Sequence, residues 1–483
     1  MTPVPFLVID IGSSSVRATL VEPDGSLGSA FSRPTPPTRS ATGTVEIDAE
    51  ELFGAVVDAA NAAIASSRTP PAVVSIANQR ASTVLFDRAT GHAIGPAISW
   101  QDIRTTGQCL TLRSSGLRLQ PSQSATKLSW LLLEAARRGG GAWSFGTLDS
   151  FLAFRLSGGA AHVTDVTNAA VTGLVTPDGS KWDRDVLELL DIPEAVLPEI
   201  VDSVAPIAPA TLLHGAPLIA GLVGDQQASL IGQACLTRGD AKVTFGTGGM
   251  LDLCLGRGST APRRGDHGTF PIVAWRDPSG TVFGLEGIVL SAGSCVDWLV
   301  GTLGVLASPA DSEAVASSAR DAGGVSFVPA LGGLGTPLWD HGARGALLGI
   351  SAATTRGEIV RAVLEGIAHR GRDLLDAIEA DAGIEIDALH LDGGMSKNGL
   401  FVQLLANATG RPVLRAEATE ATTLGAAMLG GVAAGSWSSL EEAAGIVPLP
   451  SRVEPNGSLD RSRWLDARER SLRSVPALST LVF

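Results

Sequence analysis

The residues with the most evident chemistry lie in a turn near the start of the chain, DIGSSSVR at 10–17. The amides and hydroxyls of Ser13, Ser14 and Ser15 can donate hydrogen bonds to phosphate oxygens, and Gly12 lets the backbone approach closely. Asp10, at the end of an apolar run, can hold Mg²⁺ through water. A Gly-Ser turn after a strand is by itself more often a plain hairpin, so phosphate binding needs support from other segments.

Two further glycine-rich turns supply that support. FGTGG at 245–249 matches the first turn, and two such loops facing each other would clamp a triphosphate from both sides. LDGGMSKN at 391–398 leads from a strand into a helix, and its glycines would let adenine or ribose lie against the backbone. The alternative for this segment is a simple connection in which Asn398 caps the helix.

Asp225 is the candidate for acid–base chemistry. It follows the apolar run APLIAGLV at 216–223 and precedes a helix, which places its carboxylate at the carboxyl end of a buried strand. Open α/β sheets bind their ligands at that edge. The alternative, a helix N-cap, is a frequent role of Asp. A hydroxyl that attacks a γ-phosphoryl group needs a carboxylate to accept its proton, so the phosphate loops favour the catalytic interpretation.

Hydrophobic periodicity indicates the elements that must position these residues. The apolar runs at 6–10 and 73–78 are typical of buried strands. Residues 48–66 carry apolar side chains at helical spacing, and Asp48 with Glu51 predicts a capping box at the start of that helix. The first turn therefore connects two strands, and a helix packs against them.

The second half of the chain repeats this plan. The segment at 242–255 is strand, glycine-rich turn and strand, as is the segment at 8–21, which suggests a duplication. Thr355 and Glu358 open a long amphipathic helix that Gly383 closes, and a strand comes directly after it. Both halves are thus predicted to place a glycine turn at the end of a buried strand.

The length of 483 residues and 45% hydrophobic content suit two α/β domains of a little over 200 residues each. We expect an N-terminal domain over 1–235, a C-terminal domain over 236–445, and an extension over 446–483. The net charge of −13 argues against a protein that wraps nucleic acid, because such binding needs a basic surface. A local phosphate site built from backbone amides remains compatible with this charge.

The cysteines and the hydropathy pattern bear on location. No zinc-ligand spacing connects the cysteines, so we expect four reduced core residues: Cys109, Cys235, Cys254 and Cys295. The first residues lack a basic, apolar signal segment, and no run of about 20 uncharged apolar residues occurs. These patterns predict a cytoplasmic protein without a membrane span.

Taken together, the motifs resemble those of the FGGY carbohydrate kinases, and most closely the glycerol kinase-like branch. The resemblance covers about 430 residues and rests on several motifs in the same order. The segments that carry it are VIDIGSSSVRA (8–18), SIANQR (75–80), AISWQDIRT (97–105), SATKLSWLL (124–132), GDQQASLIGQ (224–233), FGTGGML (245–251), LGTPLWDHGARGALLGI (334–350) and LDGGMSKN (391–398).

This resemblance implies the duplicated ribonuclease H-like fold of the actin and hexokinase superfamily, with ATP and Mg²⁺ in a cleft between two domains. It also implies transfer of a phosphoryl group to a terminal hydroxyl of a small polyol or sugar, and closure of the cleft on substrate. Family members are often homodimers or homotetramers, and nothing in the sequence chooses between these assemblies. The residues that the resemblance assigns are Asp10 at the metal; Ser13, Ser14, Ser15, Arg17, Thr247, Gly293, Asp297, Gly394 and Asn398 at the nucleotide; Arg80, Trp100, Asp225 and Gln226 at the polyol; and Asp225 as general base.

The acceptor site departs from the family pattern at two positions. Ala81 stands where glycerol kinases carry a glutamate, and Ser122 stands where they carry a substrate-binding tyrosine. Smaller side chains enlarge the pocket and remove polar contacts, which favours a four- or five-carbon polyol or ketose over glycerol. A plain core aromatic is the alternative for Trp100.

Two other functions stay open at this stage. A xylulokinase-like enzyme expects a Met-His pair in the loop that here reads NQRAS (78–82), which counts against it. A non-catalytic nucleotide-binding regulatory protein would explain the lost acceptor contacts. It would have no physical need for a base at Asp225.

Overall fold

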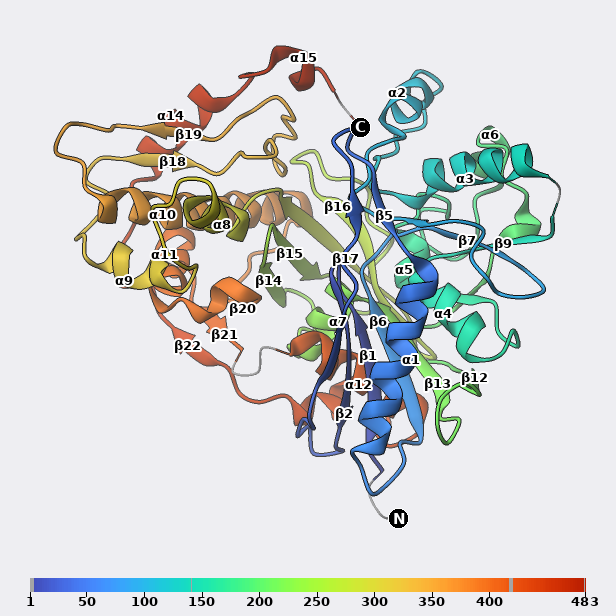
Figure 1. Ribbon diagram of the computed structural model, residues 1–483. Coiled ribbons are helices and arrows are strands. Elements are labelled where there is room, and N and C mark those ends of the chain that lie inside the picture. The colour runs from blue at the N-terminus through green and yellow to red at the C-terminus, as the bar shows by residue number, and fades with distance from the viewer. Residues whose placement is uncertain (1–3, 140, 417–419, 482) are drawn as a thin grey trace.

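The protein is described by a computed structural model over residues 4–139, 141–416, 420–481 and 483. Two large sheets lie side by side, the first built from the N-terminal part of the chain and the second from the C-terminal part (Figure 1). This is the duplicated α/β architecture that the sequence predicts.

The first sheet has six strands, and its central strands β1, β6 and β13 run parallel. Strands β2 and β3 continue the sheet in antiparallel orientation through a hairpin from β1. In spatial order the strands are β12 (Pro206–Pro209), β13 (Leu218–Gly224), β6 (Val73–Asn78), β1 (Phe6–Ile11), β2 (Ser15–Val21) and β3 (Phe31–Pro34).

The second sheet repeats the motif with seven strands. Its hairpin β14–β15 corresponds to β1–β2, and β14 runs parallel to β20 as β1 does to β6. In spatial order the strands are β16 (Phe270–Asp277), β17 (Gly280–Val289), β15 (Gly249–Cys254), β14 (Ala241–Phe245), β20 (Leu389–Asp392), β21 (Val413–Arg415) and β22 (Ser451–Val453).

Shorter sheets and helices complete the fold. The small sheets are β4 (Thr38–Arg39) with β5 (Val45–Ile47) and β8 (Ala97–Ile98), β7 (Val84–Asp87) with β9 (Trp143–Gly146), β10 (Val163–Asp165) with β11 (Glu199–Val201), and β18 (Ser326–Val328) with β19 (Ala346–Leu348). The helices are α1 (Ala49–Ala65), α2 (Thr106–Ser114), α3 (Ser124–Arg138), α4 (Leu148–Leu156), α5 (Val166–Ala170), α6 (Arg184–Leu189), α7 (Asp225–Gly232), α8 (Gly293–Gly301), α9 (Asp311–Ser317), α10 (Arg356–Ala382), α11 (Gly399–Thr409), α12 (Ala421–Ala433), α13 (Leu440–Ala443), α14 (Arg461–Ser471) and α15 (Pro476–Ser479).

The local signals in the sequence locate several of these elements well. Asp48 caps α1 by accepting from the amides of Glu50 and Glu51, but Glu51 does not return the bond, so the predicted capping box is only half formed. The Thr355–Glu358 capping box opens α10. Gly383 ends α10 in the left-handed conformation, as predicted. The four cysteines are free and buried, which confirms their assignment to the core.

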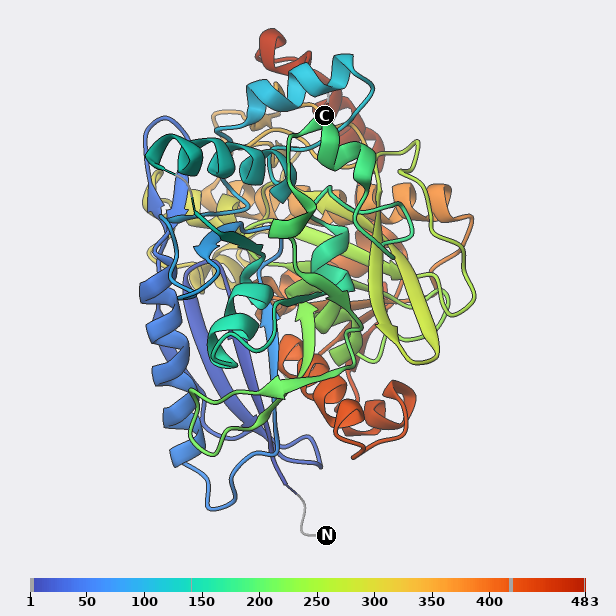
Figure 2. The same cartoon turned by 90° about the vertical axis from the view of Figure 1, so that its right-hand side faces the viewer.

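The central strand β1 is buried on both faces. Leu7 and Ile9 pack in the core under α1, whereas Phe6 and Val8 pack in the core that contains α12. Figure 2 shows α1, in blue, and the orange-red helices after residue 420 on opposite sides of the sheet. A helix late in the chain therefore completes the core of the first sheet.

The helices α7 and α12 cross at two glycines. A Cβ at Gly232 would lie 1.9 Å from the carbonyl oxygen of Ala421, and a Cβ at Gly425 would lie 1.9 Å from the carbonyl oxygen of Ala228. Side chains cannot be accommodated at either position without separating the helices. This crossing joins the helix that carries Asp225 to a helix that follows the second sheet.

We therefore expect Gly425→Ala to destabilise the protein by about 1–3 kcal/mol or more, because the helices must move apart. Thermal unfolding measures this loss. Gly54→Ala is the matched control, since nothing lies within 4 Å of a Cβ there and Gly54 is exposed within α1. The control should gain up to about 1 kcal/mol from helix propensity. Equal melting temperatures for the two variants would contradict the tight crossing.

The segment from residue 446 onward packs against both parts of the molecule. Its strand β22 pairs with β21 in the second sheet. Phe483 joins the core cluster around α2 and α3, and its carbonyl oxygen accepts a hydrogen bond of 2.6 Å from Arg264 Nη1. None of the helices in the described residues is long and apolar enough to cross a membrane.

Candidate active site

The first group of predicted site residues meets at one edge of the first sheet. Asp10 is next to last in β1, Asp225 directly follows β13, and Arg80 lies two residues beyond β6. The ends of the three parallel strands are in register at Asn78, which pairs with Ile11 on one side and Gly224 on the other. Sequence segments more than 200 residues apart therefore place their polar ends together.

Asp225 is the first residue of α7, and Gly224 occupies the N-cap position. Its Oδ1 accepts a 2.8 Å hydrogen bond from the amide of Gln226 and lies 3.7 Å from Arg80 Nε. Burial raises the pKa of Asp225 above its usual range, while the Arg80 guanidinium opposes that shift. The helix-cap interpretation is thus wrong, and the carboxylate is available for chemistry.

Arg80 extends its guanidinium between the two sheets. Nη2 donates a 2.5 Å charge-assisted hydrogen bond to Glu286 Oε2 on β17, and lies 3.7 Å from Met250 Sδ on β15. Its side chain is only 10% exposed, so this contact is protected from solvent. Arg80 therefore connects Asp225 to the second sheet.

The first predicted phosphate loop is a tight turn between β1 and β2. The amide of Gly12 donates to the carbonyl of Ser15 at 3.0 Å, and Ser14 is exposed. Trp100 Nε1 lies 3.4 Å from Ser13 Oγ, and the Trp100 amide donates to Ser82 Oγ. Trp100 is only partly buried, so its position favours a site residue over a plain core aromatic.

Asp10 and Arg17 are cross-strand partners beside this loop. Burial and the nearby Asp225 raise the pKa of Asp10 to about 7, with Arg17 lowering it. The Arg17 guanidinium forms an ion pair with Glu420, immediately before α12. Arg17, which is predicted to bind a phosphate, therefore already has its charge paired with a carboxylate from the C-terminal part of the chain.

The second group of predicted residues lies at the edge of the second sheet. The amide of Gly246 closes the turn after β14 on the carbonyl of Gly248 at 2.9 Å, and Thr247 is exposed at its tip. The amide of Gly293 donates to the carbonyl of Gly246 at 2.8 Å, where a Cβ would come within 2.5 Å of that oxygen. Only glycine allows α8 to begin this close to the loop.

The motif at 391–398 lies beside that loop because β20 pairs with β14, with Thr244 opposite Asp392. Gly394 is exposed there. Asn398 Oδ1 accepts from the amide of Phe401 at 2.8 Å, which confirms the capping role, and its Nδ2 donates to Ser312 Oγ.

Asp297 is exposed on α8, and within the described residues it makes no hydrogen bond or ion pair with the other predicted site residues. Gly293, at the start of the same helix, lies in the second loop.

Three functional candidates were missed from the sequence. Lys242 and Asp252 form a fully buried ion pair of 2.8 Å, and Glu286 contacts Arg80. Lys242 Nζ also donates a 2.6 Å hydrogen bond to Gln226 Oε1. In the sequence, each of the three apolar strands contains one charged residue. A buried charge is costly unless it has a partner, so these residues could have been recognised as candidates.

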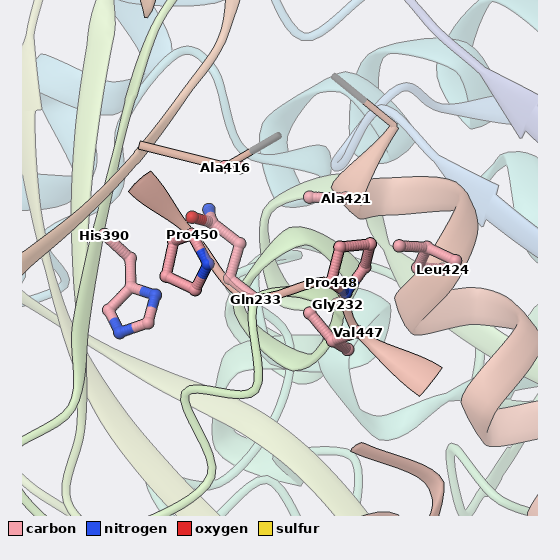
Figure 3. A pocket seen from close by; sticks show the side chains of 9 residues that line it. All are labelled: Gly232, Gln233, His390, Ala416, Ala421, Leu424, Val447, Pro448 and Pro450. Atoms are coloured by element: carbon pink, nitrogen blue, oxygen red, sulfur yellow. The ribbon is translucent and has the colours of Figure 1, made fainter. Parts of the chain in front are cut away.

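A separate small pocket lies at the other end of α7, between β20, α12 and the segment after α13 (Figure 3). No predicted site residue lines it. The lining residues are Gly232, Gln233, His390, Ala416, Ala421, Leu424, Val447, Pro448 and Pro450.

Comparison with known proteins connects this geometry to a family. The N-terminal domain of the FGGY family of carbohydrate kinases matches residues 6–232, and its C-terminal domain matches residues 241–434. The chain belongs to the FGGY family of carbohydrate kinases. It is therefore an ATP-dependent kinase with the actin and hexokinase-like fold, and the non-catalytic alternative is set aside.

Individual relatives agree over nearly the whole chain. A glycerol kinase of Dechloromonas aromatica is 41% identical, covering 96% of this chain and 97% of that protein. A glycerol kinase of Geobacillus kaustophilus is 37% identical, covering 98% of this chain and 99% of that protein. The crystal structure of Plasmodium falciparum glycerol kinase with ADP has a TM-score of 0.87 at 28% identity, covering 97% of this chain and 98% of that one.

Proposed function

We propose that this FGGY kinase transfers the γ-phosphoryl group of ATP to a terminal hydroxyl of a small polyol, with Asp225 as the general base. One observation carries the proposal: a half-buried carboxylate at the start of α7 lies beside the Arg80 guanidinium, at the edge that also holds the first phosphate loop. A base must be within reach of the hydroxyl proton, and a phosphoryl acceptor must be oriented in line. The glycerol kinase names of the relatives support a polyol as acceptor.

The acceptor would be held by the groups around Asp225. Arg80 offers guanidinium donors, Gln226 offers an amide, and Trp100 supplies an aromatic surface that reaches the first phosphate loop. Deprotonation of the hydroxyl by Asp225 then makes it a better nucleophile toward the γ-phosphorus. The proton passes to one carboxylate oxygen, and the phosphate ester forms as ADP leaves.

The nucleotide would lie between the two loops. Ser13, Ser14 and Ser15 would donate to the phosphates from the first loop, and Thr247 from the second. Arg17 would join them when it releases Glu420. The remaining part of the proposed nucleotide site comprises the backbone at Gly293 and Gly394, Asp297 on α8, and the loop that Asn398 fixes by capping α11.

The carboxylate of Asp10, beside the first phosphate loop, fits a magnesium site completed by substrate. The described residues contain no cluster of three or more metal-ligating side chains. Mg²⁺ is typically bound by one or two carboxylates together with substrate phosphates. Burial and the nearby Asp225 raise the pKa of Asp10 although Arg17 opposes the shift, so a bound cation would favour the charged form of this carboxyl. When bound, Mg²⁺ would neutralise charge on the transferring phosphoryl group, and Asp10 would hold it through water.

The acceptor is proposed to be a four- or five-carbon polyol rather than glycerol. Ala81 follows Arg80 directly, and the next residue, Ser82, accepts from the Trp100 amide, so position 81 lies next to the proposed acceptor site. Ser122 Oγ contacts Gln120 Oε1 at 3.4 Å. With alanine and serine at these two positions, fewer polar groups select for a three-carbon substrate.

A panel of polyols tests this preference. We expect the highest kcat/KM with a four- or five-carbon polyol, measured by coupled ADP release. Ala81→Glu restores an acceptor carboxylate and should raise the kcat/KM for glycerol about tenfold, the value of a charge-assisted hydrogen bond. Ala89→Glu adds the same charge at an exposed loop and should change nothing. Glycerol exceeding all longer polyols in the unmodified protein would refute the preference.

We also infer a cytoplasmic location, because ATP is the phosphoryl donor and the four buried cysteines are unpaired, as in a reducing compartment. Both a homodimer and a homotetramer are compatible with the family. Analytical ultracentrifugation would decide between them.

A further inference from the structure

Three buried charged residues form a row across the second sheet. Lys242 on β14 is opposite Asp252 on β15, and Asp252 is opposite Glu286 on β17. Directly opposed residues in antiparallel strands point to the same face of a sheet. We call these three residues the charge row, and it faces the edge of the first sheet through Arg80 and Gln226.

The charge row is costly to bury. Lys242 and Asp252 are fully buried, and Glu286 is 7% exposed. The row carries two carboxylates and one ammonium, and Arg80 supplies the second cation from the other half of the molecule. Buried ion pairs of this kind are often replaceable by apolar residues without loss of stability, so stability alone does not explain them.

Lys242 fixes the direction of the Gln226 amide. The ammonium has three donors and no acceptor. It donates hydrogen bonds to Thr244 Oγ1 at 3.0 Å and to Gln226 Oε1 at 2.6 Å, and it forms an ion pair with Asp252 Oδ2 at 2.8 Å. Gln226 must therefore present its oxygen to Lys242, because an amide nitrogen cannot accept this bond. Its Nε2 group has no hydrogen-bond partner among the described residues and is therefore available as a donor to a substrate.

Glu286 fixes Arg80 in a comparable way. Its Oε2 holds Nη2 at 2.5 Å, while Arg80 Nε faces Asp225 at 3.7 Å. The guanidinium is planar, so this contact at Nη2, together with the 3.5 Å hydrogen bond that Nη1 donates to Gln227 Oε1, sets the plane of the whole group. Burial raises the pKa of Glu286 to about 7, with Arg80 opposing that shift. The orientation of Arg80 at the proposed acceptor site thus depends on a strand of the second sheet.

We propose that the charge row is a positioning device for acceptor recognition, in which Lys242 sets Gln226 as a hydrogen-bond donor to a substrate hydroxyl and Glu286 sets the plane of Arg80. This inference rests on the proposed function, since both held residues belong to the proposed polyol site. It assigns the row to binding of the acceptor and leaves nucleotide binding to the loops. Lys242, Asp252 and Glu286 are positioning residues, because they act through Gln226 and Arg80.

The test uses Lys242→Met with Asp252→Asn, which removes both charges of the pair and leaves no unpaired buried ion. We expect the KM for the polyol to rise at least tenfold, kcat to fall less than threefold, and the KM for ATP to stay within twofold. In a Gln226→Ala background the same double substitution should raise the polyol KM no further, because Lys242 acts through that side chain. A merely structural role would lower activity equally in both backgrounds.

Glu286→Gln tests the second arm with a side chain of the same shape, and thermal unfolding of each variant reports whether it folds. It should also raise the polyol KM about tenfold while sparing the KM for ATP. Unchanged polyol KM in Glu286→Gln and in the folded double variant would overturn the inference, as would equal losses in both backgrounds. If the double variant does not fold, Glu286→Gln decides. An unmodified protein that phosphorylates no polyol would overturn the proposed function, and this inference with it.

Discussion

Asp225→Asn should lower kcat by about 10²–10⁴-fold, the usual contribution of a positioned general base. The amide has nearly the same shape and can still accept a hydrogen bond from Gln226, but it cannot take the proton of the attacking hydroxyl. Because the phosphate loops are built from other segments, ADP affinity should stay within about twofold, which calorimetry measures. The loss should therefore appear in turnover alone.

Asp48→Asn is the matched control for that variant. It makes the same chemical change at the start of another helix, where the exposed Asp48 caps α1. Asparagine is as good an N-cap as aspartate, so both stability and kcat should be unchanged. Full turnover in Asp225→Asn would remove this residue from the mechanism. Loss of ADP binding together with turnover would indicate a structural role instead.

Arg80→Met should lower the polyol kcat/KM by about 10²-fold or more, because the charge-assisted contacts of the guanidinium to the polyol and to Asp225 are both lost. It should also change the pH dependence. Asp225 acts as a base only when ionised, and its pKa is already raised by burial. The arginine lowers that pKa, so its removal raises it further.

The pH dependence should shift in one direction only. Activity falls as the pH falls through the pKa of Asp225, so the acidic limb of log kcat/KM should move to higher pH in Arg80→Met. Arg80→Lys keeps the positive charge and should shift the limb less, although it loses the planar fork. Profiles measured with a saturating concentration of ATP show the difference. An acidic limb at the same pH in all three proteins would contradict the contact between Arg80 and Asp225.

The elements that position the site could be predicted from local patterns. The apolar run at 73–78 coincides with β6, and the Thr355–Glu358 capping box begins α10. These signals are local, since periodicity and capping involve residues a few positions apart. The same is true of Asn398, whose side chain caps α11, as the alternative interpretation of that motif predicted.

Contacts between distant segments could not be predicted in the same way. Nothing near Arg17 in the sequence indicates its ion pair with Glu420, and nothing near Gly425 indicates that it crosses α7 at Gly232. The charge row is of this kind as well, since strand register brings Lys242 opposite Asp252. A lone charge in an apolar strand shows that a partner must exist, but only the pairing of strands identifies it.

The central claim is that ATP and a polyol react beside Asp225. It is tested most directly by incubating the unmodified protein with ATP, Mg²⁺ and the preferred polyol, and identifying the products by phosphorus and proton NMR. The account predicts one phosphate monoester on a terminal carbon, formed in equal amount with ADP and absent when the polyol is omitted. ADP accompanied by inorganic phosphate, with no ester, would contradict it.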